Sequence, residues 1–496
     1  MDGTFSELVS AAVKAAAGRE SALTDGRRSV PFAALAGHVA SLDRLFAVRG
    51  ISPGAVLALE ATSSVAGALT LLAVLARGLS VVLSPPDRGA PRSALPSCCR
   101  HRVTVRSELT DGARIALDDP ESFLDISENA AFDPPPGAES LASGKVLLRT
   151  SGSIGTPKLV VYSHGRLLAN ALLVVGRLRL AADDRVLLPV PLTHMFGLGA
   201  GFLPALAVGA SIDLVEGANL PRYVEHERRF EPTVAFLTPA LCFMIARQKS
   251  APSHYRHIVV AGDKLQPATF EAAERRFRRV VNLYGCTELG VISAADPAAA
   301  GAGRDTTAGA PLPGVEVRIE APRDAADAAP GAGSIACRHP YGFDGYASGD
   351  GGPWTGDPPP SDGFHRPRDL VRVHAGGALE VLGREDHSVN RDGRLVLLAD
   401  VERAMESLPG VERAVTVLGE DGLRGRRISA FCVARDGHAL DGDAIRAACA
   451  AVLPAYAIPD QVRLTASVPL LPSGKIDRRA LAALAAPNDP ARGASA

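Results

Sequence analysis

Short apolar segments that favour β-strands alternate with segments that favour helices along the first part of this chain. A strand predicted at Val56–Leu59 is followed by a helix at Ser63–Arg77 and another strand at Ser80–Leu83, and the same alternation continues from Arg166 to Leu283. A strand, a helix and a returning strand place the two strands parallel, with the helix on one face of the sheet. The pattern therefore predicts doubly wound parallel sheets.

Beyond this region, short β segments follow one another without intervening helices at Val315–Ile319, Ser334–Arg338 and Val371–Val373. They predict a small β-rich subdomain. Helix and strand patterns then mix in the last hundred or so residues, which is enough chain for a separate unit. We expect an α/β fold with a large N-terminal domain of two doubly wound sheets plus the β-rich subdomain (1–383), a hinge (384–387) and a small mobile α+β C-terminal domain (388–496).

The stretch L-R-T-S-G-S-I-G-T-P-K-L-V-V, residues 148–161, places hydroxyl groups, glycines and a lysine between two apolar strands. Glycine permits φ > 0 and brings backbone N–H groups close to an anion, while hydroxyls and a lysine add donors and charge. This predicts a polyphosphate site, although a polar hairpin turn explains the pattern equally well. The Walker spacing G-x-x-x-x-G-K-[ST] is absent. The candidate residues are Thr150, Ser151, Gly152, Ser153, Gly155, Thr156 and Lys158.

The segment N-L-Y-G-C-T-E, residues 282–288, offers an amide, an aromatic ring, a hydroxyl and a carboxylate beyond a predicted strand. A base can stack on Tyr284, Asn282 can read its edge, and Glu288 can bind a hard cation. Thr238 and Gly262-Asp263 also follow predicted strands, so we expect them in the same crevice. Ordinary strand-end turns are the simpler alternative.

Three further residues are candidates. Asp369, in H-R-P-R-D-L-V-R, can accept both hydroxyls of a ribose or pair with a neighbouring arginine, and Lys475 lies on a short glycine loop, P-S-G-K-I-D-R. His194 is followed by Gly197 and Gly199, which we expect to leave room for a ligand, although a lone histidine is more often structural.

The composition excludes several classes of protein. The formal net charge of −1 gives no basic footprint for nucleic acid. The seven cysteines include no C-x-x-C pair that would indicate zinc or redox chemistry, and they suit a reducing cytoplasm. The start of the chain lacks the basic region of a secretory signal. Its most apolar run, Val65–Ala76, is too short to cross a bilayer, so we expect no membrane partner.

Taken together and in this order, these segments resemble the adenylate-forming superfamily of acyl- and aryl-CoA synthetases, nonribosomal peptide synthetase adenylation domains and luciferases. G-A-P-L-P-G at 309–314, R-D-L-V-R at 368–372 and G-R-E-D at 383–386 add to the match. The resemblance covers nearly the whole chain. It implies a stand-alone ligase that uses ATP and Mg²⁺ to convert a carboxylic acid to an acyl-adenylate and pyrophosphate. A thiol, from coenzyme A or from the phosphopantetheine of a separate carrier protein, then accepts the acyl group.

The resemblance also implies roles for individual residues. Residues 150–158 would hold the β- and γ-phosphates, Thr287 the α-phosphate and Glu288 the metal. Lys475 would neutralise charge during adenylation. His194 is counted with Lys475, Glu288 and Thr287 as a candidate catalytic residue. The nucleotide set is completed by Asn282, Tyr284, Asp369, Arg384, Gly262 and Asp263, with Asp386 as the hinge residue. The acid pocket would comprise Phe196, Gly197, Phe236, Thr238 and Cys286.

The chain departs from the family pattern at several positions. Ile154 replaces a threonine, Pro367-Arg368 replace the usual Thr-Gly before the ribose aspartate, and Asn390 replaces a lysine after the hinge. These changes motivate one alternative, a degenerate nucleotide-binding protein. The segment after His194 lacks the aspartate that pairs the α-ammonium in amino-acid-activating relatives, and a buried unpaired ammonium is costly. We therefore expect an aryl or medium acyl acid, with an amino-acid adenylation enzyme that loads a carrier protein as the other alternative.

Overall fold

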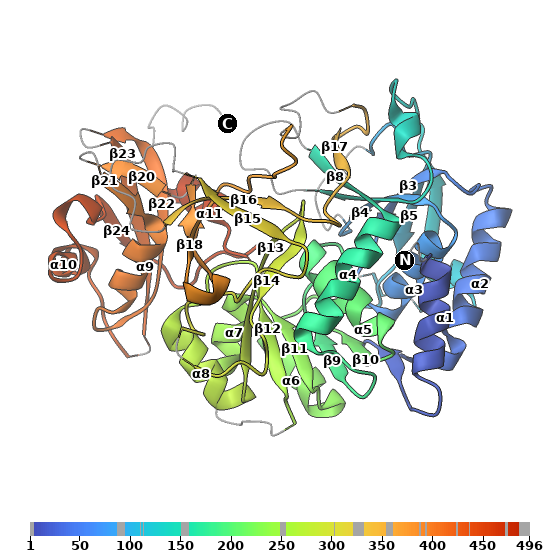
Figure 1. The fold of residues 1–496 in the computed structure, drawn as a ribbon, viewed down its shortest axis with the longest axis horizontal. Helices are drawn as coiled ribbons and strands as arrows, with labels where there is room; N and C mark the ends of the chain where they lie inside the picture. The colour runs from blue at the N-terminus through green and yellow to red at the C-terminus, as the bar shows by residue number, and fades with distance from the viewer. Residues whose placement is uncertain are drawn as a thin grey trace. The chain divides into compact units, whose positions relative to one another are not determined.

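The structure is a computed structural model of the 496-residue chain, and the described residues are 4–86, 95–109, 111–112, 114–149, 158–248, 254–301, 303–320, 332–353, 361–385, 388–391, 394–422, 425–435, 437–471 and 475–485. The chain divides into two compact units (Figure 1). The first comprises residues 1–316 and 337–365, and the second comprises residues 317–336 and 366–496. The domain limits at 383 and 388 stay a prediction, and each unit is described by itself.

The first unit contains a large mixed sheet with a parallel centre. Within the described residues this sheet has eight strands in the order β14-β13-β12-β11-β9-β10-β1-β2, of which β2 and β14 are antiparallel edge strands. The strands are β1 (Ala22–Thr24), β2 (Ser29–Pro31), β9 (Arg185–Leu188), β10 (Ser211–Leu214), β11 (Val234–Leu237), β12 (His257–Val260), β13 (Val280–Cys286) and β14 (Gly290–Ala294). Their parallel centre confirms the predicted α/β alternation.

A second sheet of the first unit holds strands from the first half of the chain. Its described strands number seven, in the order β17-β8-β7-β4-β3-β5-β6, with a parallel centre from β7 to β5. They are β3 (Val56–Glu60), β4 (Ser80–Ser84), β5 (His101–Val105), β6 (Leu124–Glu128), β7 (Lys145–Arg149), β8 (Lys158–Ser163) and β17 (Gly345–Ser348). Strand β17 reaches this sheet from far along the chain and pairs antiparallel with β8.

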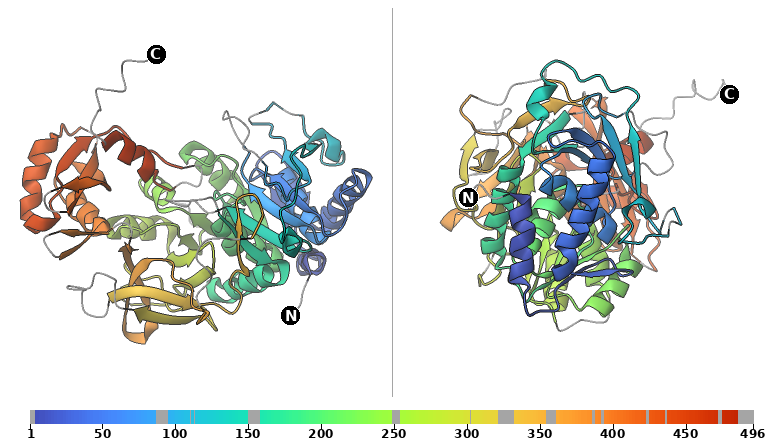
Figure 2. Two further views of the ribbon diagram at one scale, coloured as in Figure 1. Left: turned by 90° about the horizontal axis from the view of Figure 1, so that it is seen from above. Right: turned by 90° about the vertical axis from the view of Figure 1, so that its right-hand side faces the viewer.

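The strand residues alternate between two cores, as the period of two requires. In the larger sheet Val186, Leu188 and Phe236 face a core shared with the second sheet, whereas Leu187 and Leu237 face another core under α6, α7 and α8. The helices of this unit are α1 (Phe5–Ala15), α2 (Phe32–Val48), α3 (Val65–Ala76), α4 (His164–Leu178), α5 (Leu203–Ala207), α6 (Leu220–Phe230), α7 (Pro239–Ala246) and α8 (Pro267–Phe277). Helices α1 and α2 lie side by side, in dark blue in Figure 2.

The most apolar run of the chain forms helix α3, and every residue from Val65 to Leu75 is buried. A helix that is apolar on all sides is suited to the interior of a large protein. Among the helices of the described residues, none combines the length and the apolarity needed to cross a bilayer.

One helix differs from the prediction. The segment expected to form a helix at 198–208 instead forms a π-helix over Phe196–Phe202, followed by the short α5. Its sequence, F-G-L-G-A-G-F, removes the Cβ atoms that would otherwise crowd its neighbours. An alanine Cβ at Gly197 would lie 2.1 Å from the carbonyl oxygen of Pro191. The wider turn is therefore packed directly against the preceding backbone.

The second unit combines β-rich segments with a small α+β part, whereas the prediction had placed the β-rich subdomain in the N-terminal domain. Its described sheets have the orders β15-β16-β18-β19, β20-β21 and β22-β23-β24. The strands are β15 (Glu316–Glu320), β16 (Ala332–Arg338), β18 (Asp369–Val373), β19 (Leu379–Arg384), β20 (Ser388–Arg391), β21 (Arg394–Leu397), β22 (Val411–Gly422), β23 (Gly425–Ala434) and β24 (Gln461–Leu464). The helices are α9 (Leu398–Glu406), α10 (Gly442–Ala448) and α11 (Arg478–Ala485).

Candidate functional site

The candidate site of the first unit is built on the β13–β14 hairpin. The Y-G-C segment was expected to lie beyond its strand, but β13 continues through Tyr284 to Cys286 because β14 pairs with it antiparallel, with a bulge between Tyr284 and Gly285. Bulges bend a strand and redirect its side chains, and they are common beside active sites. Thr287 and Glu288 occupy the turn, at the carboxyl end of the parallel centre of the sheet.

Glu288 receives two donors from the other sheet of the unit. Its Oε1 accepts a hydrogen bond from the Tyr346 hydroxyl at 2.9 Å and pairs with Lys158 Nζ at 3.2 Å. Tyr346 pairs with Val160, which lies two residues along β8 from Lys158. The side chains of Tyr346 and Lys158 therefore lie on the same face of the sheet. The Lys158 ammonium also lies 4.0 Å from the centroid of the Tyr346 ring. A carboxylate and a cation from distant segments thus meet at one point.

Charge keeps the Glu288 carboxylate ionised despite its burial. Burial alone would raise the pKa of Glu288, but the charges of His365 and Lys158 and the hydrogen bond from Tyr346 hold that pKa below its ordinary value. Burial, and then the Glu288 charge, raise the pKa of the Tyr346 hydroxyl, so it stays a donor at neutral pH. An ionised, partly buried carboxylate is the oxygen ligand that a hard cation such as Mg²⁺ prefers, so Glu288 fits its predicted role.

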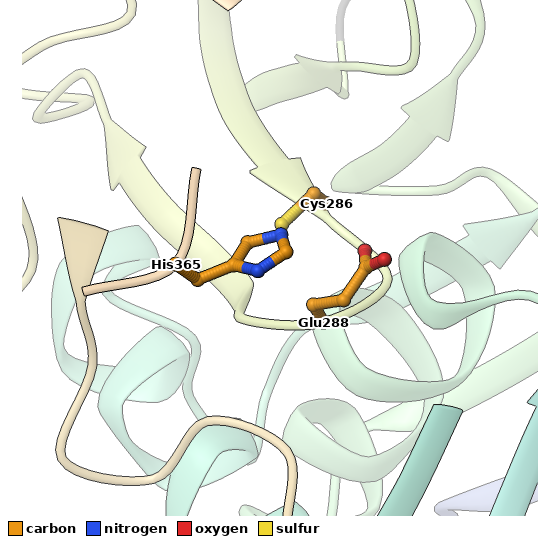
Figure 3. Close-up of side chains that lie close together, drawn as sticks. All are labelled: Cys286, Glu288 and His365. Atoms are coloured by element: carbon orange, nitrogen blue, oxygen red, sulfur yellow. The ribbon is translucent and has the colours of Figure 1, made fainter. Parts of the chain in front are cut away.

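Two further side chains lie against Glu288. One ligand atom each from Cys286, Glu288 and His365 lies within 4.8 Å of the others, and the three side chains gather as Figure 3 shows. His365 is held through its backbone, because its N–H and carbonyl both bond to Cys337 at 2.8 Å. Its ring packs edge-on against Phe343 at 5.5 Å between centroids.

The predicted base-binding residues show mixed placement. Tyr284 is buried, with 8% of its surface exposed. The Asn282 amide nitrogen already donates to the carbonyl oxygens of Arg304 at 3.0 Å and Thr307 at 3.4 Å, so this side chain ties the 304–307 loop to β13. Its reading of a base stays a prediction.

The predicted acid-pocket residues pack against one another. The Phe196 and Phe236 rings meet edge to face at 5.8 Å, and Phe236 is fully buried in the core, so the pocket stays a prediction. The expectation that Gly197 and Gly199 leave room beside His194 is wrong. A Cβ at Gly199 would lie 2.5 Å from the Met195 sulfur, so the chain's own atoms occupy that space, as they do beside Gly197. The partly buried His194 accepts at its carbonyl from the Leu198 N–H, 2.9 Å away, at the start of the π-helix.

Thr238 follows β11 and Gly262-Asp263 follow β12, the neighbour of β13 in the sheet, so all three residues follow strands as predicted. Thr238 caps α7, with its hydroxyl accepting from the Leu241 N–H at 3.4 Å. Gly262 has φ +103°, a conformation that favours glycine, and Asp263 accepts from the Lys264 N–H at 2.8 Å. These residues therefore share one sheet edge with the hairpin.

In the second unit Asp369 and Arg384 pair across β18 and β19. The Arg384 Nη1 lies 3.5 Å from the Asp369 carboxylate, and the two residues are register partners. The alternative to ribose binding was an ion pair between Asp369 and a neighbouring arginine, Arg366, Arg368 or Arg372. Two of these arginines also have other carboxylate partners, since Arg366 pairs with Glu320 and Arg372 with Glu380. Lys475 is exposed on its glycine loop, where its carbonyl accepts from the Leu471 N–H at 2.7 Å.

Several predicted residues lie outside the described part of the chain, and their roles stay predictions. They are Thr150, Ser151, Gly152, Ser153, Gly155, Thr156 and Asp386.

A cavity of about 100 Å³ lies elsewhere in the first unit, and none of the predicted site residues lines it. Its charged groups pair with one another. Arg28 donates two hydrogen bonds to Glu108, and this contact lowers the pKa of Glu108 to about 2. His226, which also lines the cavity, pairs with the fully buried Asp213 at 2.8 Å. These two ion pairs occupy much of the charge beside the cavity, so the cavity is not assigned a function.

Two residues of the site escaped the sequence analysis. Tyr346 lies on a strand of four residues, too short to show a period, in a glycine-rich stretch. His365 lies four residues before Asp369 in a segment that was considered for its aspartate alone. Its position next to a candidate motif was the available signal.

Comparison with known proteins matches both parts of the chain. The family model described as AMP-binding enzyme matches residues 10–347, and that of the AMP-binding enzyme C-terminal domain matches residues 400–475. The chain is 27% identical over 478 residues to a sulfoacetate–CoA ligase of Cupriavidus necator, with 92% of each protein covered. It is 29% identical over 477 residues to a feruloyl-CoA synthase of Amycolatopsis sp, with 92% of this chain and 94% of that protein covered.

Among solved structures, that of the anthranilate–CoA ligase AuaEII in complex with anthranoyl-AMP is similar to this fold. The TM-score is 0.77 with 20% identity, covering 97% of this chain and 99% of the other. At this identity the likeness concerns the fold.

Proposed function

The chain belongs to the family of AMP-binding enzymes and is an ATP-dependent acid–thiol ligase that forms an acyl-AMP intermediate, and we propose that its substrate is an aryl or medium acyl acid without an α-amine. The proposed acceptor is the thiol of coenzyme A or of a separate carrier protein. The observation that chiefly supports adenylation at this site is the meeting of Lys158, Glu288 and Tyr346, because it supplies a cation and an ionised carboxylate at one point.

The proposed work of these residues is positioning and charge stabilisation. Adenylation is a displacement at the α-phosphorus, which depends on alignment and on stabilising charge more than on covalent help. Lys158, with residues 150–156, holds the β- and γ-phosphates. Glu288 holds Mg²⁺, which neutralises phosphate charge when bound, and Thr287 donates to the α-phosphate.

The second unit supplies the remaining groups in this proposal. The Asp369 carboxylate accepts the ribose hydroxyls, and its partner Arg384 keeps it oriented. The exposed Lys475 places its positive charge close to the reacting phosphate, and Asp386 acts as the hinge residue.

The acid preference rests on the π-helix segment. Its residues are apolar, and no carboxylate lies from Phe196 to Leu203 to pair an ammonium. The Phe196 and Phe236 rings pack edge to face, which adds to the apolar character of the region. Feruloyl-CoA synthase, one of the similar proteins, acts by its name on an aryl acid. Both observations favour an aryl acid over an amino acid.

ATP–pyrophosphate exchange with a panel of aryl, acyl and α-amino acids tests the proposal. We expect an aryl or medium acyl acid to support exchange. Lys475→Ala should lower that exchange by at least about 100-fold if the lysine stabilises the displacement, whereas Lys14→Ala, at an exposed lysine of α1, should leave it unchanged. A response to α-amino acids alone would overturn the acid preference. Equal activity of wild type and Lys475→Ala would exclude the lysine role, and the absence of exchange with every acid would favour the degenerate nucleotide-binding alternative.

A further inference from the structure

The cluster of Cys286, Glu288 and His365 contains a thiol and an imidazole, which a magnesium site does not require. Mg²⁺ prefers oxygen ligands and near-octahedral geometry. A thiolate and an imidazole instead suit borderline and soft cations such as Zn²⁺. Among the described residues these three side chains form the group of His, Cys, Asp and Glu whose ligand atoms lie within 4.8 Å of one another.

Backbone contacts fix the three residues in place. Cys286 is paired with Gly290 in the hairpin, and His365 is bonded through both backbone groups to Cys337. The Phe343 N–H donates to the Glu288 carbonyl at 2.8 Å, and the Phe343 ring contacts His365. The donors are therefore positioned by the fold before any ion binds, which favours tight binding.

The geometry is close to that of a three-ligand zinc site. Zn–S distances of about 2.3 Å and Zn–N or Zn–O distances of about 2.0 Å require donor separations of roughly 3.5 Å in a tetrahedron. Because the donor atoms lie within 4.8 Å of one another, a tetrahedral site requires a contraction of at most about 1.3 Å, which side-chain rotation can supply. Three protein ligands leave a fourth position open.

The charge on Lys158 opposes a cation here but does not block it. Lys158 and Tyr346 both bind Oε1 of Glu288, and a carboxylate has a second oxygen for a metal. The Lys158 side chain is 28% exposed, so its ammonium can turn toward solvent.

We propose that Cys286, Glu288 and His365 bind Zn²⁺ in the nucleotide-free protein, and that this ion inhibits adenylation by taking the carboxylate assigned to Mg²⁺. Zinc binding is independent of the proposed function, whereas the inhibition rests on it.

Cobalt(II) titration of the nucleotide-free, full-length protein tests binding directly. We expect one equivalent of Co²⁺ to give a thiolate-to-cobalt charge-transfer band in the near ultraviolet, and Zn²⁺ to abolish it by displacement. Cys286→Ser should remove the band, and His365→Gln should weaken Co²⁺ binding by about tenfold or more. Cys98→Ser is the matched thiol control, because Cys98 lies 3.9 Å from Cys99 in a separate sulfur pair. A band that persists in Cys286→Ser, or no band in the native protein, would overturn the proposal.

Exchange assays at saturating Mg²⁺ test the inhibition, with each variant normalised to its own zinc-free rate. Zn²⁺ should inhibit the native enzyme at concentrations about tenfold or more below those that inhibit Cys286→Ser. Equal sensitivity would overturn the inhibitory role. If no acid supports exchange, the proposed function fails while the cobalt spectrum still decides the metal site.

Discussion

Lys158 and Glu288, 130 positions apart in the sequence, form an ion pair with 3.2 Å between Nζ and Oε1. The pair joins the two sheets of the first unit, because Lys158 begins β8 and Glu288 follows β13, each the neighbour of an edge strand. Tyr346 completes the contact by donating to the same oxygen. In the proposed reaction Lys158 leaves this pair for the phosphates, which frees the carboxylate for the metal.

The hydroxyl of Tyr346 should matter to catalysis through Glu288. Tyr346→Phe removes the 2.9 Å hydrogen bond and keeps the ring against Lys158. A hydrogen bond to a charged group contributes about 1.5–3 kcal/mol, so exchange should fall by about tenfold or more. Exchange measured across a Mg²⁺ series checks this, with Tyr341→Phe, at an exposed tyrosine, as control. An unchanged rate at every Mg²⁺ concentration would contradict it.

Gly197→Ala should destabilise the first unit. Its Cβ would lie 2.1 Å from the Pro191 carbonyl oxygen, and overpacking of this kind costs about 1–3 kcal/mol or more. Gly176→Ala is the matched control, because a Cβ at this exposed position in α4 meets nothing within 4 Å. That control should gain up to about 1 kcal/mol from helix propensity. Urea unfolding of both variants measures the difference. Equal stability of Gly197→Ala and Gly176→Ala would show that the π-helix accommodates the extra Cβ without a cost in free energy.

Arg368→Gly should stabilise the second unit. Arg368 has φ +64°, where a side chain is strained by about 1–2 kcal/mol and glycine is not. The backbone bond from the Glu385 N–H to the Arg368 carbonyl, 2.8 Å long, is unaffected by the change. We expect a gain of about 1 kcal/mol in the free energy of unfolding. Arg368→Ala distinguishes the effect of the backbone strain from the effect of the arginine charge, because it removes the charge but keeps the strain. A gain with alanine equal to that with glycine would rule out the backbone explanation.

Stability of the first unit should fall in mild acid because of His257. Burial, and then Arg256, lower the pKa of His257 from 6.5 to about 4. Because the folded-state pKa is depressed, the unfolded chain takes up the proton first, and stability is lost as pH falls from about 6.5 toward 4. The loss at pH 5 is roughly 2 kcal/mol.

Thermal unfolding from pH 7.5 to pH 5 checks this effect. His257→Gln should flatten the pH dependence by about that amount, although the buried His164 and His339, whose pKa values burial also lowers to about 4, will keep part of it. His438→Gln, at an exposed histidine, is the control. If stability fell equally steeply with pH in wild type and His257→Gln, the prediction would be contradicted.

Glu406 should give the second unit the opposite dependence. Burial raises the pKa of Glu406 from 4.5 to about 7, so its contribution to stability is present below pH 4.5 and is lost as pH rises to about 7. Glu406→Gln keeps an acceptor for the Ala414 N–H, 3.1 Å from Oε1, and carries no charge. At pH 8 the variant should be more stable by about 3 kcal/mol, and at pH 4 close to wild type. Denaturant unfolding at the two pH values measures this, and equal stability at pH 8 would refute it.

The alternation of apolar periods determined much of the architecture from the sequence alone. Strands β3 and β4 and helix α3 lie within two residues of their predicted limits, because a buried parallel strand and a long apolar helix each carry a local signal. The π-helix was not predicted because close contacts with Pro191, Met195 and Leu188 leave no space for a Cβ at its three glycines. The apolar period of the local sequence does not reveal these contacts.

The sequence by itself determined the fold class, the family and the chemical types of the candidate residues, since these follow from local periodicity and from motifs of contiguous residues. Only the tertiary structure decided which of those residues meet. It brought Lys158, Tyr346 and His365 to Glu288, paired Asp369 with Arg384 and committed the Asn282 amide to a loop. The physical reason is that hydrogen bonds and ion pairs act over a few ångströms of space, and strand pairing across sheets sets those distances for residues far apart in the chain.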